Sequence, residues 1–114
     1  MIRIISRTKQ TKFSVVNLGE LVPKMQSIAV DELNIPRAEE LKPKDVSVSV
    51  QEVYPFDSER DDISFKIEAD ANPQLSMNLY EYQKKIRKRF RKMIPKKFSI
   101  SVWLTISQGS HGRA

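Results

Sequence analysis

The clearest pattern of hydrophobic and polar positions lies in residues 79–94. Apolar side chains recur there at spacings of three and four, which places them along one stripe of an α-helix: Leu79, Tyr82, Ile86, Phe90 and Met93. Pro95 ends this helix, because proline has no N–H to donate and its ring clashes with the preceding turn. From Phe98 the apolar positions alternate, so residues 98–106 are expected to form a half-buried strand.

Three earlier segments also have the composition or the alternation of strands. They are the β-branched run Ile2, Ile4 and Ile5 with Arg3 and Arg7 interleaved, then Val46, Val48 and Val50 alternating with Ser47 and Ser49, and last Ile63, Phe65 and Ile67 alternating with Ser64, Lys66 and Glu68. Residues 8–15 and 35–45 are polar or proline-containing, and we expect them to be connections.

A first helix is expected within residues 17–33, from a second stripe at helical spacing. Its members are Leu18, Leu21, Val22, Met25, Ile28, Ala29 and Leu33. Pro23 deletes one backbone hydrogen bond, so either the first turn is irregular or the regular helix begins near Leu21. The helix that contains residues 79–94 has two competing N-caps, Asn72–Pro73 and, later, Asn78.

The element order β-α-β-β-α-β predicts an α+β two-layer sandwich, in which two helices cover one face of a four-stranded sheet. Two arrangements share this order. In one, each half keeps its two parallel strands adjacent; in the other, a ferredoxin-like sheet, the halves interleave. Periodicity does not separate them. Residues 1–107 are expected to form this single domain, and residues 108–114 a polar C-terminal tail.

Composition narrows the class of protein without naming a function. With 39% hydrophobic and 30% charged residues, the chain of 114 residues is typical of a globular protein. It has no cysteine, which excludes disulfides and thiolate metal sites. No apolar run approaches the ~18 residues of a membrane span, and the start lacks an apolar signal segment, so a cytoplasmic protein is expected. The net charge of +6 favours anionic partners.

The polar face of the 79–94 helix is strongly cationic. Its basic residues are Lys84, Lys85, Arg87, Lys88, Arg89, Arg91 and Lys92, and Lys96 and Lys97 extend the run. A solvated helix face usually mixes signs, since like charges repel by a few tenths of a kcal/mol per i,i+4 pair. We therefore expect a counter-charge from phosphate, from an acidic partner chain, or from the chain's own Asp57, Glu59, Asp61 and Asp62.

The basic helix, residues 84–97, is thus the leading candidate for a binding site. The anion-binding candidates are Lys84, Lys85, Arg87, Lys88, Arg91 and Lys92. If nucleic acid is the partner, these side chains contact phosphates, without base specificity and with a steep dependence on salt. The alternative is a solvated outer face with no ligand.

Other residues that carry chemistry point to no further site. Trp103 falls on the open sheet face, where subunit packing accounts for it. An RNA-recognition motif needs aromatic residues on the open face of its central strands, whereas Phe65 is in phase with core positions. A single histidine, His111, cannot form the usual zinc site, so we expect no metal and no cofactor. The carboxylate pairs 39–40 and 61–62 lie in loops, where neighbouring side chains point apart.

Four stretches carry a resemblance to a known family: GELVPKMQSIAVDELNIP, KDVSVSVQEVYPF, ISFKIEADANPQLSMNLYEYQKKIRKRF and FSISVWLTI. In element order, length and hydrophobic spacing they resemble the tautomerase superfamily. They are most similar to its longer members, related to carboxymethyl-hydroxymuconate isomerase, which fuse two β-α-β units in one chain. The resemblance implies the arrangement with adjacent parallel strands. It also implies a homotrimer whose polar sheet faces turn inward around a three-fold axis.

The chain departs from that family at its N-terminus. The family uses an N-terminal proline as general base, whereas here Met1 precedes Ile2, and a bulky second residue is expected to leave Met1 in place. The leading hypothesis is therefore a non-catalytic or repurposed tautomerase-like protein that binds an anionic partner through the basic helix. The alternative is a tautomerase or isomerase acting on a small carboxylated substrate, with the partly neutral Met1 α-amine as base. A third hypothesis is a structural subunit whose charge a partner chain satisfies.

Overall fold

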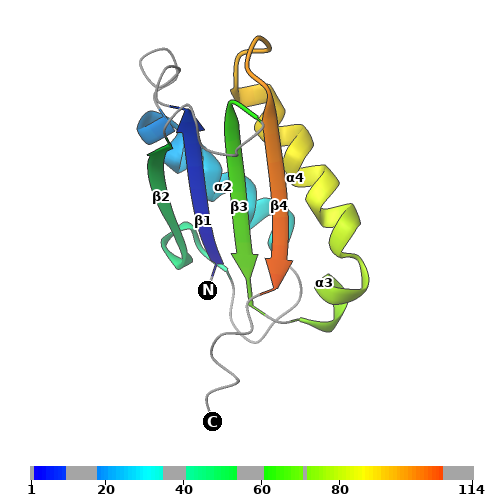
Figure 1. Ribbon diagram of the computed structural model, residues 1–114. Coiled ribbons are helices and arrows are strands. Elements are labelled where there is room, and N and C mark those ends of the chain that lie inside the picture. Colours follow the sequence, from blue (N-terminus) through cyan, green and yellow to red (C-terminus); the bar gives the residue numbers. More distant parts are fainter. Residues whose placement is uncertain (1, 10–17, 35–40, 54–60, 71, 107–114) are drawn as a thin grey trace.

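The computed structural model of the protein describes residues 2–9, 18–34, 41–53, 61–70 and 72–106 (Figure 1). Its elements follow the expected order. They are β1 (Ile2–Lys9), the 3-10 turn η1 (Leu18–Leu21), α2 (Val22–Leu33), the 3-10 turn η2 (Pro43–Asp45), β2 (Val46–Val53), β3 (Ile63–Ala69), α3 (Pro73–Met77), α4 (Leu79–Met93) and β4 (Ile100–Ile106).

The four strands form one mixed sheet in the order β2-β1-β3-β4. β1 pairs in parallel with β2, and β3 in parallel with β4, while β1 and β3 meet antiparallel in the middle. Each β-α-β half therefore keeps its two parallel strands side by side. This order confirms the tautomerase-like arrangement, and the ferredoxin-like alternative, with interleaved halves, is wrong.

Both long helices cover the same face of the sheet, which confirms the two-layer α+β sandwich. α2 and α4 lie behind the strands in Figure 1 and run in opposite directions. The core between the layers is built from strand residues Ile2, Ile4, Val46, Ile63, Phe65, Ile67, Ile100, Val102 and Leu104, and from helix residues Met25, Ile28, Ala29, Leu33, Ile86 and Phe90. The stripe predicted from the spacing in residues 79–94 thus points into the core.

The start of the first helix shows how Pro23 is accommodated. The chain enters through the short 3-10 turn η1, and regular α-helix begins only at Val22. Pro23 then occupies the first turn of α2, where its missing N–H has no helical partner to lose. Both halves of the expectation hold, because the first turn is irregular and the regular helix begins beside Leu21.

The two candidate starts of the second helix are both used, by separate helices. Asn72 caps the short helix α3: its Oδ1 accepts hydrogen bonds from the N–H groups of Gln74 (2.9 Å) and Leu75 (3.3 Å). The chain then breaks at Asn78, and α4 begins at Leu79. The second β-α-β unit therefore holds a one-turn helix that periodicity alone merged with α4.

β1 is longer than expected, and the face that it buries under the helices is more polar. Thr8 and Lys9, placed in a connection from their polarity, belong to β1, because its backbone pairs with β2 up to Lys9. Ser6 and Thr8 are fully buried on the helix-covered face. The Ser6 hydroxyl donates to the sulfur of Met25 at 3.4 Å. The core face of β1 is therefore only half apolar.

Candidate functional site

The helix α4 carries the predicted site, and its own sequence explains why it folds despite its charge. Lysine, arginine and glutamine are good helix formers, so the cationic face costs little in propensity. Arg91 and Lys92 lie in the last turn, where positive charge is favourable to the helix dipole. Ile86 and Phe90 are fully buried, and the Phe90 ring packs edge-on against Phe65 with a centroid distance of 4.7 Å.

Arg91, one of the predicted anion-binding residues, is engaged with the backbone of its own chain. Its Nη2 donates to the carbonyl of Pro95 at 2.7 Å and to that of Ile94 at 3.4 Å. These carbonyls lie just beyond the end of α4, where backbone acceptors lack helical donors. The side chain is half-buried, so Arg91 closes the C-terminus of the helix. It contributes less open positive charge than the sequence pattern indicated.

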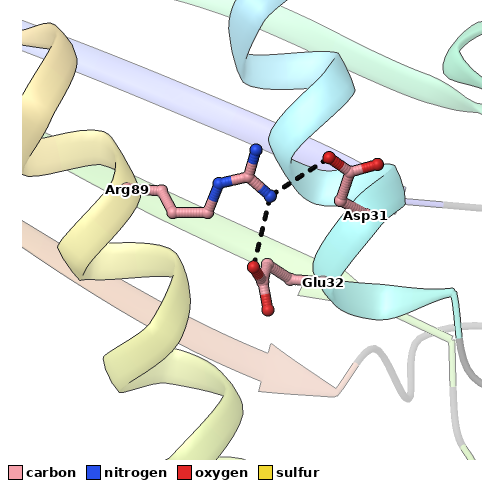
Figure 2. A network of polar contacts seen from close by, with 3 residues as sticks. All are labelled: Asp31, Glu32 and Arg89. Atoms are coloured by element: carbon pink, nitrogen blue, oxygen red, sulfur yellow. Dashed lines mark hydrogen bonds and ion pairs between the residues drawn. The ribbon is translucent and has the colours of Figure 1, made fainter.

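Arg89 is paired with an internal counter-charge, which comes from α2 and not from the acidic residues expected to provide it. Its Nη1 lies 3.1 Å from Asp31 Oδ2 and 3.2 Å from Glu32 Oε2, both at the end of α2 (Figure 2). Hydrogen bonds to Asp31 and then to Glu32 raise the pKa of the guanidinium above its usual value. The side chain therefore stays charged and ties α4 to α2.

Among the described residues, the acidic side chains before β3 form no ion pair with α4. Asp57 and Glu59 lie outside the described residues. Asp62 accepts a hydrogen bond from the Ser99 N–H at 3.0 Å, and its own N–H donates to the Ser99 hydroxyl at 2.9 Å. The Asp62 carboxylate thus fixes the entry to β4. The two acids that pair with Arg89, Asp31 and Glu32, lie on α2, and periodicity could not place them beside this arginine.

The remaining cations of α4 lie on its exposed side. Lys84, Lys85, Arg87, Lys88 and Lys92 are all exposed. Lys84 Nζ lies 3.8 Å from the exposed carboxylate of Glu81 and 5.4 Å from the centroid of the Tyr80 ring. In the part of the chain that the structure describes, no acidic side chain forms an ion pair with Arg87, Lys88 or Lys92. We call these five exposed residues the basic surface of α4.

Three shallow hollows adjoin the basic surface. One of about 380 Å³ lies between α2 and α4, with Lys24 and Lys92 at its sides. A second, of about 320 Å³, is formed by Glu81, Lys84, Lys85 and Lys88. The third, of about 300 Å³, lies between α4 and β4 and is lined in part by Arg87 and Trp103. Each hollow carries at least one cation without an acidic partner among the described side chains.

The open sheet face holds charges that the sequence analysis did not assign to a site. Arg3 Nη2 pairs with Glu68 Oε1 at 3.0 Å, and Arg7 Nε donates to Gln51 Oε1 at 3.3 Å. Lys66 lies beside Trp103 in register. The alternation in residues 2–8 was the available signal, since it places both arginines opposite the buried isoleucines. This face thus carries Arg3, Arg7, Lys66 and Glu68 beside Trp103.

The other candidates lie outside the described residues or form no centre. The Met1 α-amine and His111 are outside the described residues, as is the carboxylate pair 39–40. Among the described residues, no three side chains of histidine, cysteine, aspartate or glutamate gather closely enough to hold a metal ion. In the same part of the chain, no helix has the length and apolarity needed to cross a membrane.

Comparison with known proteins supports the fold. No family model matches the sequence, and no curated protein matches it. Among solved structures, the chain is similar to a macrophage migration inhibitory factor-like protein from Entamoeba histolytica, with a TM-score of 0.58 and 10% sequence identity. The match covers 96% of this chain and 91% of that chain. At this identity the likeness establishes a shared fold, in agreement with the resemblance to the tautomerase superfamily.

Proposed function

We propose that this protein is a non-catalytic or repurposed tautomerase-like binding protein, whose basic α4 residues receive an anionic partner. The proposed contact residues are those of the basic surface, Lys84, Lys85, Arg87, Lys88 and Lys92. Arg91, the sixth candidate from the sequence, lies at their edge and also donates to the backbone carbonyls of Ile94 and Pro95. One observation carries the proposal: Arg87, Lys88 and Lys92 are exposed and have no acidic partner among the described side chains. Neighbouring like charges on a helix repel, and an anion on this surface removes that repulsion.

The pairing of Arg89 sharpens the proposal. Where α4 faces α2, the cation is matched by two carboxylates of the chain itself. On the exposed side, the described part of the chain offers only the pair between Lys84 and Glu81, with its atoms 3.8 Å apart and both side chains exposed. Pairs of this kind contribute little. The unmatched charge is therefore concentrated on the side that a partner can reach.

Retention on immobilised heparin tests the proposal. The double variant Lys84→Glu with Arg87→Glu should elute at a much lower salt concentration than the wild-type protein. The matched control is Lys42→Glu with Lys44→Glu, which makes the same change in net charge at exposed positions beside β2. Equal losses in both variants would show a general effect of net charge. Failure of the wild-type protein to bind heparin at low salt would refute the proposal.

A catalytic assay separates this function from the alternative. A tautomerase would convert the enol and keto forms of a phenylpyruvate-type substrate. For a protein whose function is binding, we expect no turnover. Turnover that disappears when the N-terminal amine is blocked would identify the Met1 α-amine as the base. Turnover that survives the block would point to another group.

The homotrimer implied by the resemblance belongs to this proposal, as does a cytoplasmic location. A trimer whose sheet faces turn inward would cover Trp103, which is 61% exposed in the single chain. Light scattering on the purified protein should then give three times the chain mass of 13.2 kDa. A mass equal to that of one chain would remove the trimer and leave the basic surface of α4 unaffected.

A further inference from the structure

The hollow between α2 and α4 lies on the helix-covered side of the molecule. Its volume is about 380 Å³, within the range of about 300–1,000 Å³ that is usual for small-molecule sites. Six side chains line it, three from each helix: Lys24, Ser27, Ile28, Arg89, Lys92 and Met93. We call this hollow the interhelix pocket. Both helices lie opposite the open sheet face (Figure 1), so a trimer whose sheet faces turn inward leaves the interhelix pocket accessible.

Two lysines give the interhelix pocket its charge. Lys24 lies in the first turn of α2 and Lys92 in the last turn of α4, and both side chains are exposed. Because the two helices run in opposite directions, these turns lie beside each other (Figure 1). Among the described side chains, no carboxylate forms an ion pair with either lysine. The pocket therefore carries positive charge that the described part of the chain leaves unmatched.

Arg89 adds directional hydrogen-bond donors to this charge. Its Nη1 donates to Asp31 at 3.1 Å and to Glu32 at 3.2 Å, and neither carboxylate lines the pocket. Within the described residues, no acceptor bonds to its Nη2 or Nε, and Figure 2 shows both away from the two dashed contacts. The carboxylates thus hold the guanidinium in one orientation and leave donors for a ligand. A side chain that is already fixed loses little entropy on binding.

The rest of the lining is a hydroxyl group and an apolar floor. Ser27 is exposed on α2, so its hydroxyl can donate to a ligand. Ile28 is a buried core residue, and the partly buried Met93 packs against the core. Methionine is flexible, so it adapts to apolar groups of different shape. A ligand in the pocket therefore meets cations at the exposed side and apolar surface beneath.

We propose that the interhelix pocket binds a small organic phosphate, namely a phosphomonoester with a short apolar body. Its phosphate carries a charge of about −1.5 to −2 and three acceptor oxygens, which match the two lysines and the donors of Arg89 and Ser27. A carboxylate has one charge and two oxygens, so it would leave one lysine unmatched. The apolar body would lie on the floor of the pocket. This inference rests on the proposed function, since it names the anionic partner that Lys92 of the basic surface receives.

Titration of the full chain with phenyl phosphate, followed by amide NMR spectra, tests the inference. The amide signals of residues 24–28 and 89–93 should shift. The indole N–H signal of Trp103, which lies on the opposite face of the sheet, should not. Phenyl phosphate should bind about tenfold more tightly than inorganic phosphate, which has no apolar body. It should also bind about tenfold more tightly than benzoate, which lacks the second charge.

Variants with matched controls locate the site. Lys24→Ala removes a charge-assisted contact and should weaken phenyl phosphate binding by about tenfold. Its control is Lys44→Ala, at an exposed lysine of η2 that does not line the pocket. Ser27→Glu places a carboxylate among the cations, so it should abolish binding and raise the melting temperature of the free protein. Ser76→Glu, at an exposed position of α3 away from the pocket, should do neither.

The outcomes distinguish this inference from the proposal on which it rests. Absence of amide shifts at the pocket, with heparin retention still lost in Lys84→Glu with Arg87→Glu, would keep the proposed function and overturn the phosphate pocket. Shifts at the pocket of a protein that heparin does not retain would support the pocket and refute the proposed function. Affinity for benzoate or inorganic phosphate equal to that for phenyl phosphate would overturn the phosphomonoester. Binding that is unchanged in Lys24→Ala and Ser27→Glu would place the site elsewhere, with the same consequence.

Discussion

The two β-α-β halves of the chain share a topology and one anchoring device. In the first half, Gln26 of α2 donates from Nε2 to the carbonyl of Val46 at 2.9 Å. In the second half, Gln83 of α4 accepts the Leu104 N–H at 2.9 Å. Both bonds tie a covering helix to the backbone of an edge strand, β2 in one half and β4 in the other. The halves differ in where they place their other polar groups.

The first half puts polar groups inside, and the second puts cations outside. Ser6 and Thr8 are fully buried under the helices, whereas every core-facing residue of β3 is apolar. α2 carries both signs of charge, while the exposed side of α4 is almost entirely positive. Burial of one large apolar side chain contributes about 1.5–3 kcal/mol, against a few tenths for each repelling pair. A fully apolar inner face therefore lets α4 carry a repulsive outer surface.

The largest expected effect tests whether the second half holds the stronger core. Phe90→Ala removes a fully buried ring that packs edge-on against Phe65, and it should lower the free energy of unfolding by about 3–5 kcal/mol. Met25→Ala, also fully buried but in contact with the Ser6 hydroxyl, should cost less. Urea denaturation measures both. An equal or larger loss for Met25→Ala would contradict the comparison.

A smaller effect tests the anchoring glutamines. Gln83→Leu leaves the Leu104 N–H without its acceptor at a buried residue, and it should lower the free energy of unfolding by about 1–3 kcal/mol. Gln26→Leu frees a carbonyl instead, at Val46, and an under-satisfied carbonyl is tolerated more readily than an orphaned N–H. The expected order of destabilisation in urea is therefore Gln83→Leu above Gln26→Leu. The reverse order would show that the unpaired Val46 carbonyl costs more stability than the unpaired Leu104 N–H.

Most of the fold could be predicted from the sequence because hydrophobic periodicity is a local property. The α4 stripe and the alternation in β3 and β4 gave the buried faces correctly. Strand order could not be predicted, since both candidate sheets bury the same faces. Thr8 was missed for a different reason. Its polarity favours a loop. However, β1 lies between two partner strands, and backbone pairing on both sides keeps Thr8 in the sheet.

The cationic residues of the candidate site could be predicted from the sequence, but their contacts could not. The cationic run on α4 is visible in the sequence, and its exposed members are where the spacing placed them. The partners of Arg89 are not visible, because Asp31 is 58 residues away and only the packing of α2 against α4 brings the two together. Periodicity therefore predicts which face of an element is exposed, but it does not predict contacts between side chains of different elements.

A third prediction concerns the polar interior of the first half. Thr8 Oγ1 is buried and has no hydrogen-bond partner in the described part of the protein. Thr8→Val keeps the shape of the side chain and removes the unpaired hydroxyl, so it should raise the free energy of unfolding by about 1 kcal/mol. Ser6→Ala loses a contact with the Met25 sulfur and should show no such gain. A loss of stability in Thr8→Val would indicate that the hydroxyl is satisfied in solution.

The smallest expected effect asks whether α4 has two electrostatic sides or one uniform field. Arg89→Ala removes the link between the helices and leaves Asp31 and Glu32 to repel each other, so the urea midpoint should fall. Arg87→Ala removes a cation that has no acidic partner among the described side chains, so the midpoint should stay or rise. The Arg89 side chain is 39% exposed, and about 1 M sodium chloride should therefore shrink the difference between the two variants. Equal shifts at low salt would mean that the cations of α4 act together. In that case the distinction between a paired inner side and an open outer side would have no energetic basis.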